Sequence, residues 1–393
     1  MEDERSQARG INRSLLEDLS TVTLRGKPGR DRRLLTGLSF LLILLPLSAC
    51  GHRQDIMKPV TVAEPTTGRV DMLVATTREP AADPARRYTG ERGETVRLDN
   101  IIVSIPPEKM RQSGQVQWPS YGKPDAKTEF LTVKAEPLAD KDITPWFKRT
   151  SGPKRRVLVF VHGFNNSYSD AVYRFAQIAH DMHMDAAPVL FTWPSRGNVL
   201  DYVYDRESTI YSRFGLATVL DEAVKSPDVA DVTILAHSMG TWLTMEVLRE
   251  IAFRKGKVSP KIKTVVLASP DIDVDVFRRQ VLEIGPQRPH ITIFSSRNDL
   301  ALTLSTFLAG DVQRLGVTDF KPYEKLLEEQ KISVIDASDV QQTSFLGHST
   351  FAESSDMLKA VTNRLADQEL EAEAPLLPGA GLLQIGYRIV SRR

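Results

Sequence analysis

From Arg156 onward, apolar runs alternate with stretches of helical periodicity, and this alternation constrains the fold more than any other feature. The runs are continuous in Val, Ile, Leu and Phe, which is typical of strands buried on both faces of a sheet. The stretches between them carry apolar residues on one stripe, which is typical of amphipathic helices. Strands that alternate with helices predict an α/β fold: a mostly parallel central sheet covered by helices on both faces. Functional loops are then expected at the carboxyl ends of the strands.

This pattern assigns residues 151–370 to one α/β domain. The expected strands are the runs VLVFVHG, PVLFTW, VTILAH, TVVLAS, ITIFSS and ISVIDA. The expected helices lie at 169–182, 213–225, 241–255, 274–284, 300–309 and 353–370.

The segment 68–150 before this domain has a different pattern, with short β-like runs broken by Pro, Gly and Asp. Two arrangements are open for it. It forms a small β-rich unit packed on the main domain, or it supplies the first, antiparallel strands of the main sheet. Arg78 and Tyr88 in this segment are expected at the surface, in contact with solvent, with a position facing the site as the alternative.

Composition excludes several classes of function. The 393 residues are 41% hydrophobic, enough for a substantial core. The 51 basic and 50 acidic side chains leave a net charge of +1, so nothing favours a nucleic-acid partner. The single cysteine, Cys50, excludes an internal disulfide framework and a multi-cysteine zinc site.

The N-terminus has the pattern of a secretory signal. Basic residues at 25–33 precede an apolar run that ends in Leu47-Ser48-Ala49-Cys50. This ending resembles the lipobox of bacterial lipoproteins, which implies a signal at 1–49 and an acylated Cys50 as membrane anchor. Gly51 after the cysteine implies an outer-membrane address facing the periplasm, with an inner-membrane anchor as the alternative. Residues 50–67 are expected to be a tether, and 371–393 a poorly ordered C-terminal tail.

The run DVTILAHSMG places Ser238 at a sharp turn between a strand and a helix. In a nucleophile elbow the serine has a strained backbone, and the residues two before and two after it must be small because strand and helix approach closely. Ala236 and Gly240 meet this requirement. The pattern alone is weak, so its surroundings decide.

Four blocks of sequence, HGFN, FTWPS, AHSMG and ASPDID, resemble those of the α/β-hydrolase superfamily, and more narrowly a largely uncharacterised bacterial group within it. The resemblance covers roughly residues 68–365. It implies a catalytic Ser-His-Asp triad in the chain order Ser, Asp, His. Ser238 follows the fifth strand of that fold, Asp299 the seventh and His348 the eighth.

The same resemblance implies the remaining site residues. The oxyanion donors are expected to be the backbone N–H groups of Met239 and Phe164, while the side chain of Asn165 donates or only satisfies its own turn. Of the seven histidines, His348 is the one on a loop just beyond the last strand. Asp271 or Asp273 is the alternative to Asp299 as the triad acid.

Other candidate residues receive simpler interpretations. His180 and His183 are expected on a solvated helix face, because no metal motif accompanies them. The stretch 195–211 is expected to be the longest loop near the site. Its tyrosines, with Trp193, line an aromatic wall or pack the loop onto the domain. Ser195 is expected to be exposed and structural.

The sequence therefore predicts a serine hydrolase, most simply a carboxylesterase or lipase-like enzyme acting on a small-molecule or lipid ester. Attack by serine requires no metal and no organic cofactor. Thioesterase, amidase and peptidase activities stay open. The alternative from another class is an envelope lipoprotein that keeps the fold as a binding or scaffolding module.

Overall fold

The computed structural model describes residues 56–120, 122–183, 185–308, 312–321, 327, 330–340, 350–354 and 357–363. The predicted signal, the acylation site Cys50, the triad histidine His348 and the C-terminal tail lie outside these residues.

The described chain forms one nine-stranded sheet in the order β3-β2-β1-β5-β4-β6-β7-β8-β9. Every neighbouring pair from β1 to β9 is parallel, and only β2 runs antiparallel to its neighbours β1 and β3. The mostly parallel sheet predicted from sequence is therefore confirmed. The strands are β1 (Gly68–Pro80), β2 (Tyr88–Ile105), β3 (Leu131–Pro137), β4 (Arg156–Val161), β5 (Ala187–Thr192), β6 (Asp231–His237), β7 (Ile262–Ala268), β8 (His290–Ser295) and β9 (Ile332–Asp336).

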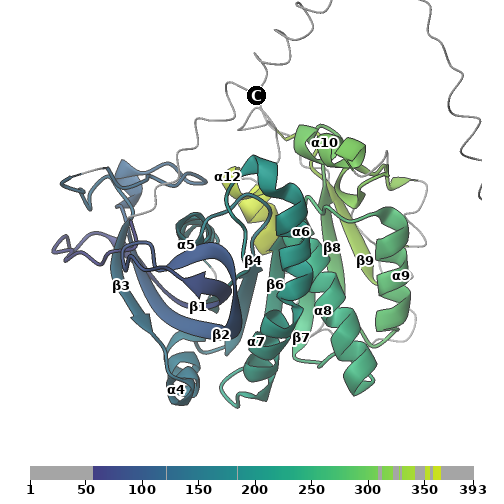
Figure 1. The fold of residues 1–393 in the computed structure, drawn as a ribbon, viewed down its shortest axis with the longest axis horizontal. Helices are drawn as coiled ribbons and strands as arrows, with labels where there is room; N and C mark the ends of the chain where they lie inside the picture. The colour runs from purple at the N-terminus through teal and green to yellow at the C-terminus, as the bar shows by residue number, and fades with distance from the viewer. Residues whose placement is uncertain are drawn as a thin grey trace, which may run out of the picture. The chain divides into compact units, whose positions relative to one another are not determined.

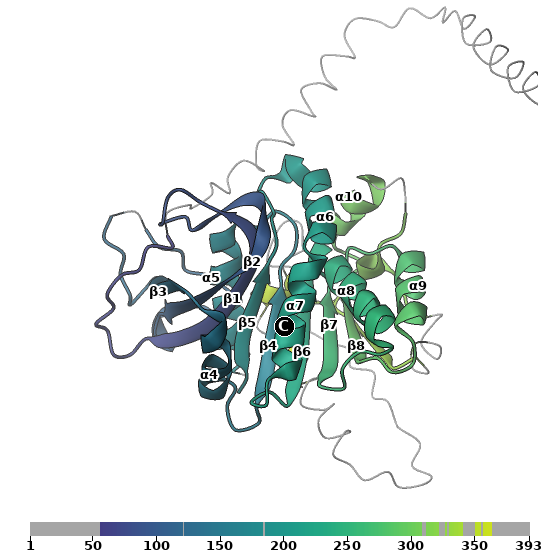
Figure 2. The ribbon, with the colours of Figure 1, turned by 60° about the horizontal axis from the view of Figure 1, so that its bottom comes forward.

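Helices cover both faces of the sheet, and each face has its own core. Val157 and Val159 of β4 pack in a cluster with residues of α4, α7, α8 and α9, while Leu158 and Phe160 pack in the other cluster with α5. Figure 1 shows α7, α8 and α9 in front of the sheet and α5 behind it, and Figure 2 shows the same layers from another side. The helices are α4 (Asp140–Thr150), α5 (Tyr168–Asp181), α6 (Tyr202–Tyr211), α7 (Arg213–Lys225), α8 (Met239–Lys255), α9 (Val274–Ile284), α10 (Leu300–Leu308) and α12 (Thr350–Glu353).

The alternation along β4 explains why a continuous apolar run is needed here. Phe160 is 2% exposed and stacks on Phe175 of α5 with ring centroids 5.3 Å apart. Burying one such side chain contributes about 1.5–3 kcal/mol. Both faces of the strand lie in a core, so polar residues are excluded from both.

The N-terminal segment joins the main sheet rather than forming a separate unit. Parallel pairing of Leu73–Thr76 with Val189–Thr192 connects β1 to β5, so β1, β2 and β3 extend one edge of the sheet. Tyr88 at the start of β2 is buried at 7% exposure, because its ring packs against that of Tyr168 at 4.8 Å. The expectation that Tyr88 faces solvent is wrong.

Two helices are absent from the sequence interpretation. α4 lies inside the segment expected to be β-rich, and its Ile143, Trp146 and Phe147 are buried at helical spacing. The stretch 195–211 contains a short 3-10 helix, Val199–Asp201, followed by α6. The expectation of a long loop there is corrected, because Tyr202–Tyr211 makes a continuous helix that continues almost directly into α7.

Candidate active site

The strand-to-helix turn at Ser238 has the backbone of a nucleophile elbow. Ser238 has φ 51° and ψ −122°, a conformation that L-residues rarely adopt. A Cβ atom at Gly240 would lie 2.3 Å from the carbonyl oxygen of His162, so only glycine fits there. The Thr241 hydroxyl donates to the Ser238 carbonyl at 2.6 Å and helps to hold the turn.

The loop after β4 lies directly against this serine. A Cβ at Gly163 would come within 2.9 Å of the Ser238 Cβ and the His237 Nδ1. The glycine therefore allows the loop to approach the serine closely. Asn165 follows at φ 59°, in the left-handed region that asparagine tolerates better than most residues.

Most backbone N–H groups of this loop already donate to an acceptor. The Asn165 N–H donates to Asp205 Oδ2 at 3.3 Å, and the Asn166 N–H donates to Ser195 Oγ at 3.0 Å. The Asn166 side chain donates to the carbonyl of Phe164 at 2.8 Å, so the asparagine that satisfies the turn is Asn166. Among the contacts of the described residues, the Phe164 N–H has no acceptor.

Arg78 of β1 joins three segments beneath this loop. Its guanidinium donates to the Asn166 carbonyl at 2.8 Å, the Ser195 carbonyl at 2.7 Å, the Thr192 hydroxyl at 2.9 Å and the Thr89 carbonyl at 3.2 Å. The side chain is 0% exposed, and burial lowers the pKa of Arg78 to about 10. The sequence expectation of a solvated Arg78 is wrong.

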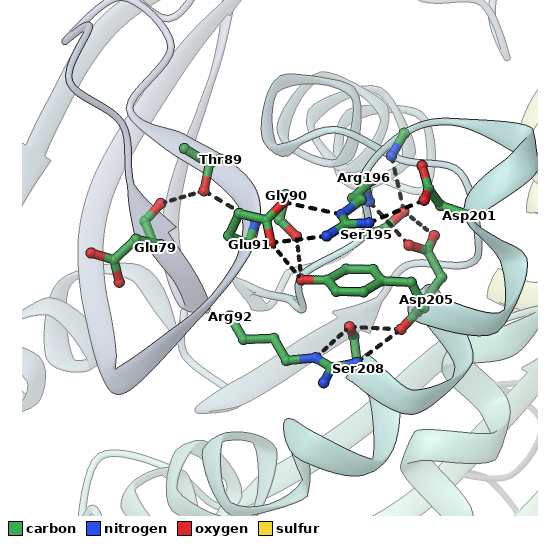
Figure 3. Close-up of polar contacts among 12 residues, drawn as sticks. Glu79, Thr89, Gly90, Glu91, Arg92, Ser195, Arg196, Asp201, Asp205 and Ser208 are labelled. Atoms are coloured by element: carbon green, nitrogen blue, oxygen red, sulfur yellow. Dashed lines mark hydrogen bonds and ion pairs between the residues drawn. The ribbon is translucent and has the colours of Figure 1, made fainter.

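Asp205 of α6 is the second buried anchor of the loop. Its carboxylate accepts the Ser195 hydroxyl at 2.5 Å and the Arg196 N–H at 3.0 Å, in addition to the Asn165 N–H. Figure 3 shows Ser195, Arg196 and Asp205 gathered at this point. Burial raises the pKa of Asp205, although hydrogen bonds from Ser195 and the backbone oppose the shift. Ser195 is 0% exposed, so its structural role is as expected but its exposure is not.

His162 belongs to the framework of the loop and points away from the elbow serine. Its Nδ1–H donates to the Gly163 carbonyl at 2.8 Å, while Nε2 accepts from Thr192 and the Trp193 N–H. Its ring stacks on Trp193 at 4.8 Å. Burial, together with the positive charge of Arg78, lowers the pKa of His162 to about 3, so the imidazole is neutral at physiological pH.

The three candidate acids have different surroundings. Asp271 is 6% exposed, and both of its oxygens are engaged: Oδ1 accepts the Ser305 hydroxyl at 2.7 Å and forms an ion pair with Arg314 Nε at 3.1 Å, and Oδ2 accepts the Tyr202 hydroxyl at 3.0 Å. Asp273 caps the N-terminus of α9 through the Val276 N–H. Asp299 is 0% exposed and its Oδ1 accepts the Leu302 N–H at 3.0 Å at the start of α10.

The aromatic residues of 195–211 mostly hold α6 in place. The hydroxyls of Tyr204 and Tyr211 donate to the carbonyls of Gly90 and Gly93 in β2. Tyr202 differs, because its ring lies edge-on to Phe164 at 5.3 Å, next to the loop. Packing is therefore the role of Tyr204 and Tyr211, and Tyr202 alone has a ring beside the Phe164 segment.

The part of the chain that the structure describes shows no sign of a metal site or a membrane span. No group of three or more His, Cys, Asp or Glu side chains there is suited to a metal ion. His180 lies near the carboxylates of Glu108 and Asp181, 3.6 and 3.5 Å from Nδ1. No described helix is long and apolar enough to cross a membrane.

Comparison with protein families identifies the fold family. A family model described as alpha/beta hydrolase of unknown function matches residues 139–364, more than half of the chain. The chain belongs to this family of α/β hydrolases. The family match supports a hydrolase and names no substrate.

Individual relatives are distant. An uncharacterized protein of Nostoc sp. (strain PCC 7120) is 28% identical, over 28% of this α/β hydrolase and 36% of its own length. The chain thus spans about a third of that relative. Carboxyl esterase 2 of the mycorrhizal fungus Tuber melanosporum is 9% identical, with a TM-score of 0.38 over 85% of this chain and 97% of its own. A Pyrobaculum calidifontis esterase is 11% identical, with a TM-score of 0.33 over 92% and 99%. Likenesses at this level carry no argument about activity.

Proposed function

We propose that this α/β hydrolase is a serine hydrolase that cleaves acyl esters, with Ser238 as nucleophile. The observation that carries the proposal is the positive-φ turn at Ser238 against the glycine loop, beside the uncommitted N–H of Phe164. Such a turn stores strain, and strained backbone is kept where it serves a function. Met239 at the first position of α8 supplies a second N–H next to the serine.

The chemistry follows from these groups. Ser238 Oγ attacks the ester carbonyl, and His348 takes the serine proton and passes it to the leaving alcohol. The N–H groups of Phe164 and Met239 donate to the oxyanion that forms. Water then attacks the acyl-enzyme, with His348 as base, and releases the acid.

Asp299 is the proposed partner of His348. Asp271 and Asp273 are each engaged elsewhere, Asp271 with Tyr202, Ser305 and Arg314 and Asp273 as a helix cap. Moving Asp271 toward a histidine would break a buried ion pair. Asp299 also caps a helix, since its Oδ1 accepts the Leu302 N–H at the start of α10. The preference for Asp299 over Asp273 therefore rests on chain position, because Asp299 follows β8, where the superfamily's chain order expects the acid.

A fluorophosphonate probe tests the nucleophile directly. The protein is expected to form one covalent adduct at Ser238, located by mass spectrometry, and Ser238→Ala is expected to form none and to lose on the order of 10⁶ in kcat. Ser259→Ala is the control, because Ser259 lies just before β7, at the end of the sheet opposite Ser238. A folded protein that takes no label would support the scaffolding alternative instead.

A panel of esters, thioesters, amides and peptides with graded acyl lengths tests the substrate class. We expect the highest kcat/KM on esters. Faster turnover of thioesters or amides at matched acyl length would move the assignment to that class.

We also propose that the protein is a lipid-anchored component of a bacterial envelope, most simply at the outer membrane facing the periplasm. The lipobox-like ending at Cys50 supports this proposal. Metabolic labelling with palmitate is expected to mark the wild-type protein and not Cys50→Ala. Equal labelling of both would refute the anchor.

A further inference from the structure

A pocket opens behind the loop after β4, at the junction of the β1–β2 hairpin and the start of α5. It is narrow and partly open to solvent. Its lining includes three arginines, Arg78, Arg86 and Arg196, together with hydroxyl-bearing Thr89 and Ser169. None of these residues belongs to the proposed triad or to the oxyanion donors.

Arg78 brings a buried positive charge to the pocket wall. A guanidinium has five N–H donors, and the contacts of Arg78 use one at Nε, two at Nη1 and one at Nη2. The second N–H of Nη2 has no acceptor among the described residues. No carboxylate lies within ion-pair distance of Arg78 in the described part of the chain. The charges of Asp205 and Asp170 act on Arg78 from beyond ion-pair distance, and each carboxylate accepts a hydrogen bond from a serine.

Arg86 adds a second charge at the same pocket. It is partly buried, and its side chain forms no hydrogen bond or ion pair with any residue that the structure describes. Arg196 differs, because Glu91 and Asp201 neutralise it at 3.0 and 3.2 Å (Figure 3). Among the described residues, Arg78 and Arg86 of the pocket therefore have no carboxylate in ion-pair contact.

We propose that this pocket binds a small oxyanion, a phosphate or carboxylate group. Arginine presents planar N–H groups that match such oxygens, and charge-assisted hydrogen bonds are strongest where water is partly excluded. A bound anion would accept the remaining Nη2 N–H of Arg78 and pair with Arg86. The ligand is a free anion or the acidic group of an ester substrate. A substrate group is considered because Arg78, which lines the pocket, also donates to the Asn166 carbonyl in the loop after β4, and that loop lies against Ser238.

Titration calorimetry on the full chain carrying Ser238→Ala tests binding apart from catalysis. Inorganic phosphate and acetate are titrated at low ionic strength against a chloride control. We expect saturable binding that Arg86→Gln weakens about tenfold or more, as the loss of one charge-assisted contact predicts. Arg69→Gln is the matched control, since Arg69 is an exposed arginine at the opposite end of β1, and its binding is expected to be unchanged.

Binding that chloride reproduces, or that Arg86→Gln leaves unchanged while the protein stays folded, overturns the proposal. So does the absence of heat with either anion. Because Ser238 is replaced in the binding experiment, a failure here leaves the hydrolase proposal untouched, and a catalytically inactive protein leaves this one untouched.

The two sources of the anion are separated with wild-type protein. Phosphate that raises KM for an ester bearing a carboxylate, and not for a neutral ester of equal length, assigns the pocket to the acidic group of the substrate. Phosphate that binds without changing either KM assigns it to a free anion. Both results support an oxyanion site.

Discussion

The two sides of Ser238 are held in different ways. On the side of the loop after β4, two buried charged groups form hydrogen bonds with the loop backbone. They are Arg78 and Asp205, which come from distant parts of the chain. On the side of the candidate acids, Asp271 links side chains of α6, α10 and Arg314 to one another. The first arrangement fixes the positions of backbone N–H groups, and the second fixes helices. We infer that the loop side positions the oxyanion donors, whereas the Asp271 cluster stabilises the fold.

The largest expected effect separates the two buried acids. Asp299→Asn is expected to lower kcat by up to ~10⁴, because the histidine loses its orienting partner. Asp271→Asn is expected to keep most activity and to lose stability instead. Steady-state kinetics with a model ester, beside urea unfolding, measure both. An inactive D271N with an active D299N would exchange the two roles.

The next effect tests the loop side. Asp205→Asn replaces one carboxylate oxygen with an NH2 group, which cannot accept a hydrogen bond. A donor of the loop, such as the Asn165 N–H, then loses its acceptor, so the loop shifts and the Phe164 N–H moves away from the oxyanion. We expect kcat to fall by about 10²–10³, the cost of one oxyanion donor, with little change in KM. Asp201→Asn, which loses only a half-exposed ion pair with Arg196, is the matched control and should change kcat less than about twofold. A raised KM at unchanged kcat would assign Asp205 to substrate binding.

The Asp271 cluster is tested by Tyr202→Phe. This change removes one hydroxyl that donates to Asp271 and contacts Ser305. The expected loss is about 1.5–3 kcal/mol in the free energy of unfolding, typical of a buried hydrogen bond to a charged group. Tyr204→Phe is the control, since the Tyr204 hydroxyl also bonds a carbonyl, that of Gly90, and a carboxylate, the exposed Glu91, and its loss should cost less. Equal losses of unfolding free energy in the two variants would contradict a special role of Asp271 in stability.

The smallest effect is a pH dependence on the loop side. His162 has a pKa of about 3 in the folded protein, below its ordinary value of 6.5, because burial and Arg78 disfavour its charged form. The unfolded chain therefore binds the proton more tightly, so this group lowers stability as pH falls below 6.5 and down to about 3. The slope is ~1.4 kcal/mol per pH unit. His162→Gln should remove this part of the slope in urea unfolding followed from pH 7 to 5. An unchanged slope would show that His162 is not buried as a neutral ring.

Local patterns predicted the parallel sheet, the elbow and its small neighbours, because strands, helices and tight turns depend on residues close in sequence. α7 and α9 begin and end where the apolar periodicity placed them. Arg78 was assigned to the surface because its partners, such as Asn166, lie 88 positions away. Asp205 was not singled out, since a carboxylate on an expected loop gives no sign that a serine and two backbone N–H groups converge on it. The roles of Phe164, Met239, Asp299 and His348 stay predictions.

The pairing of β1 with β5 also bears on where this protein can be divided. The family segment begins at residue 139, after β3, although β5 is paired on that side by residues 73–76. A chain shortened to 139–364 would leave β5 as an open edge, and such edges recruit strands from other molecules. Size-exclusion chromatography should then report aggregates. By covering β5, the first three strands thus protect the domain from self-association.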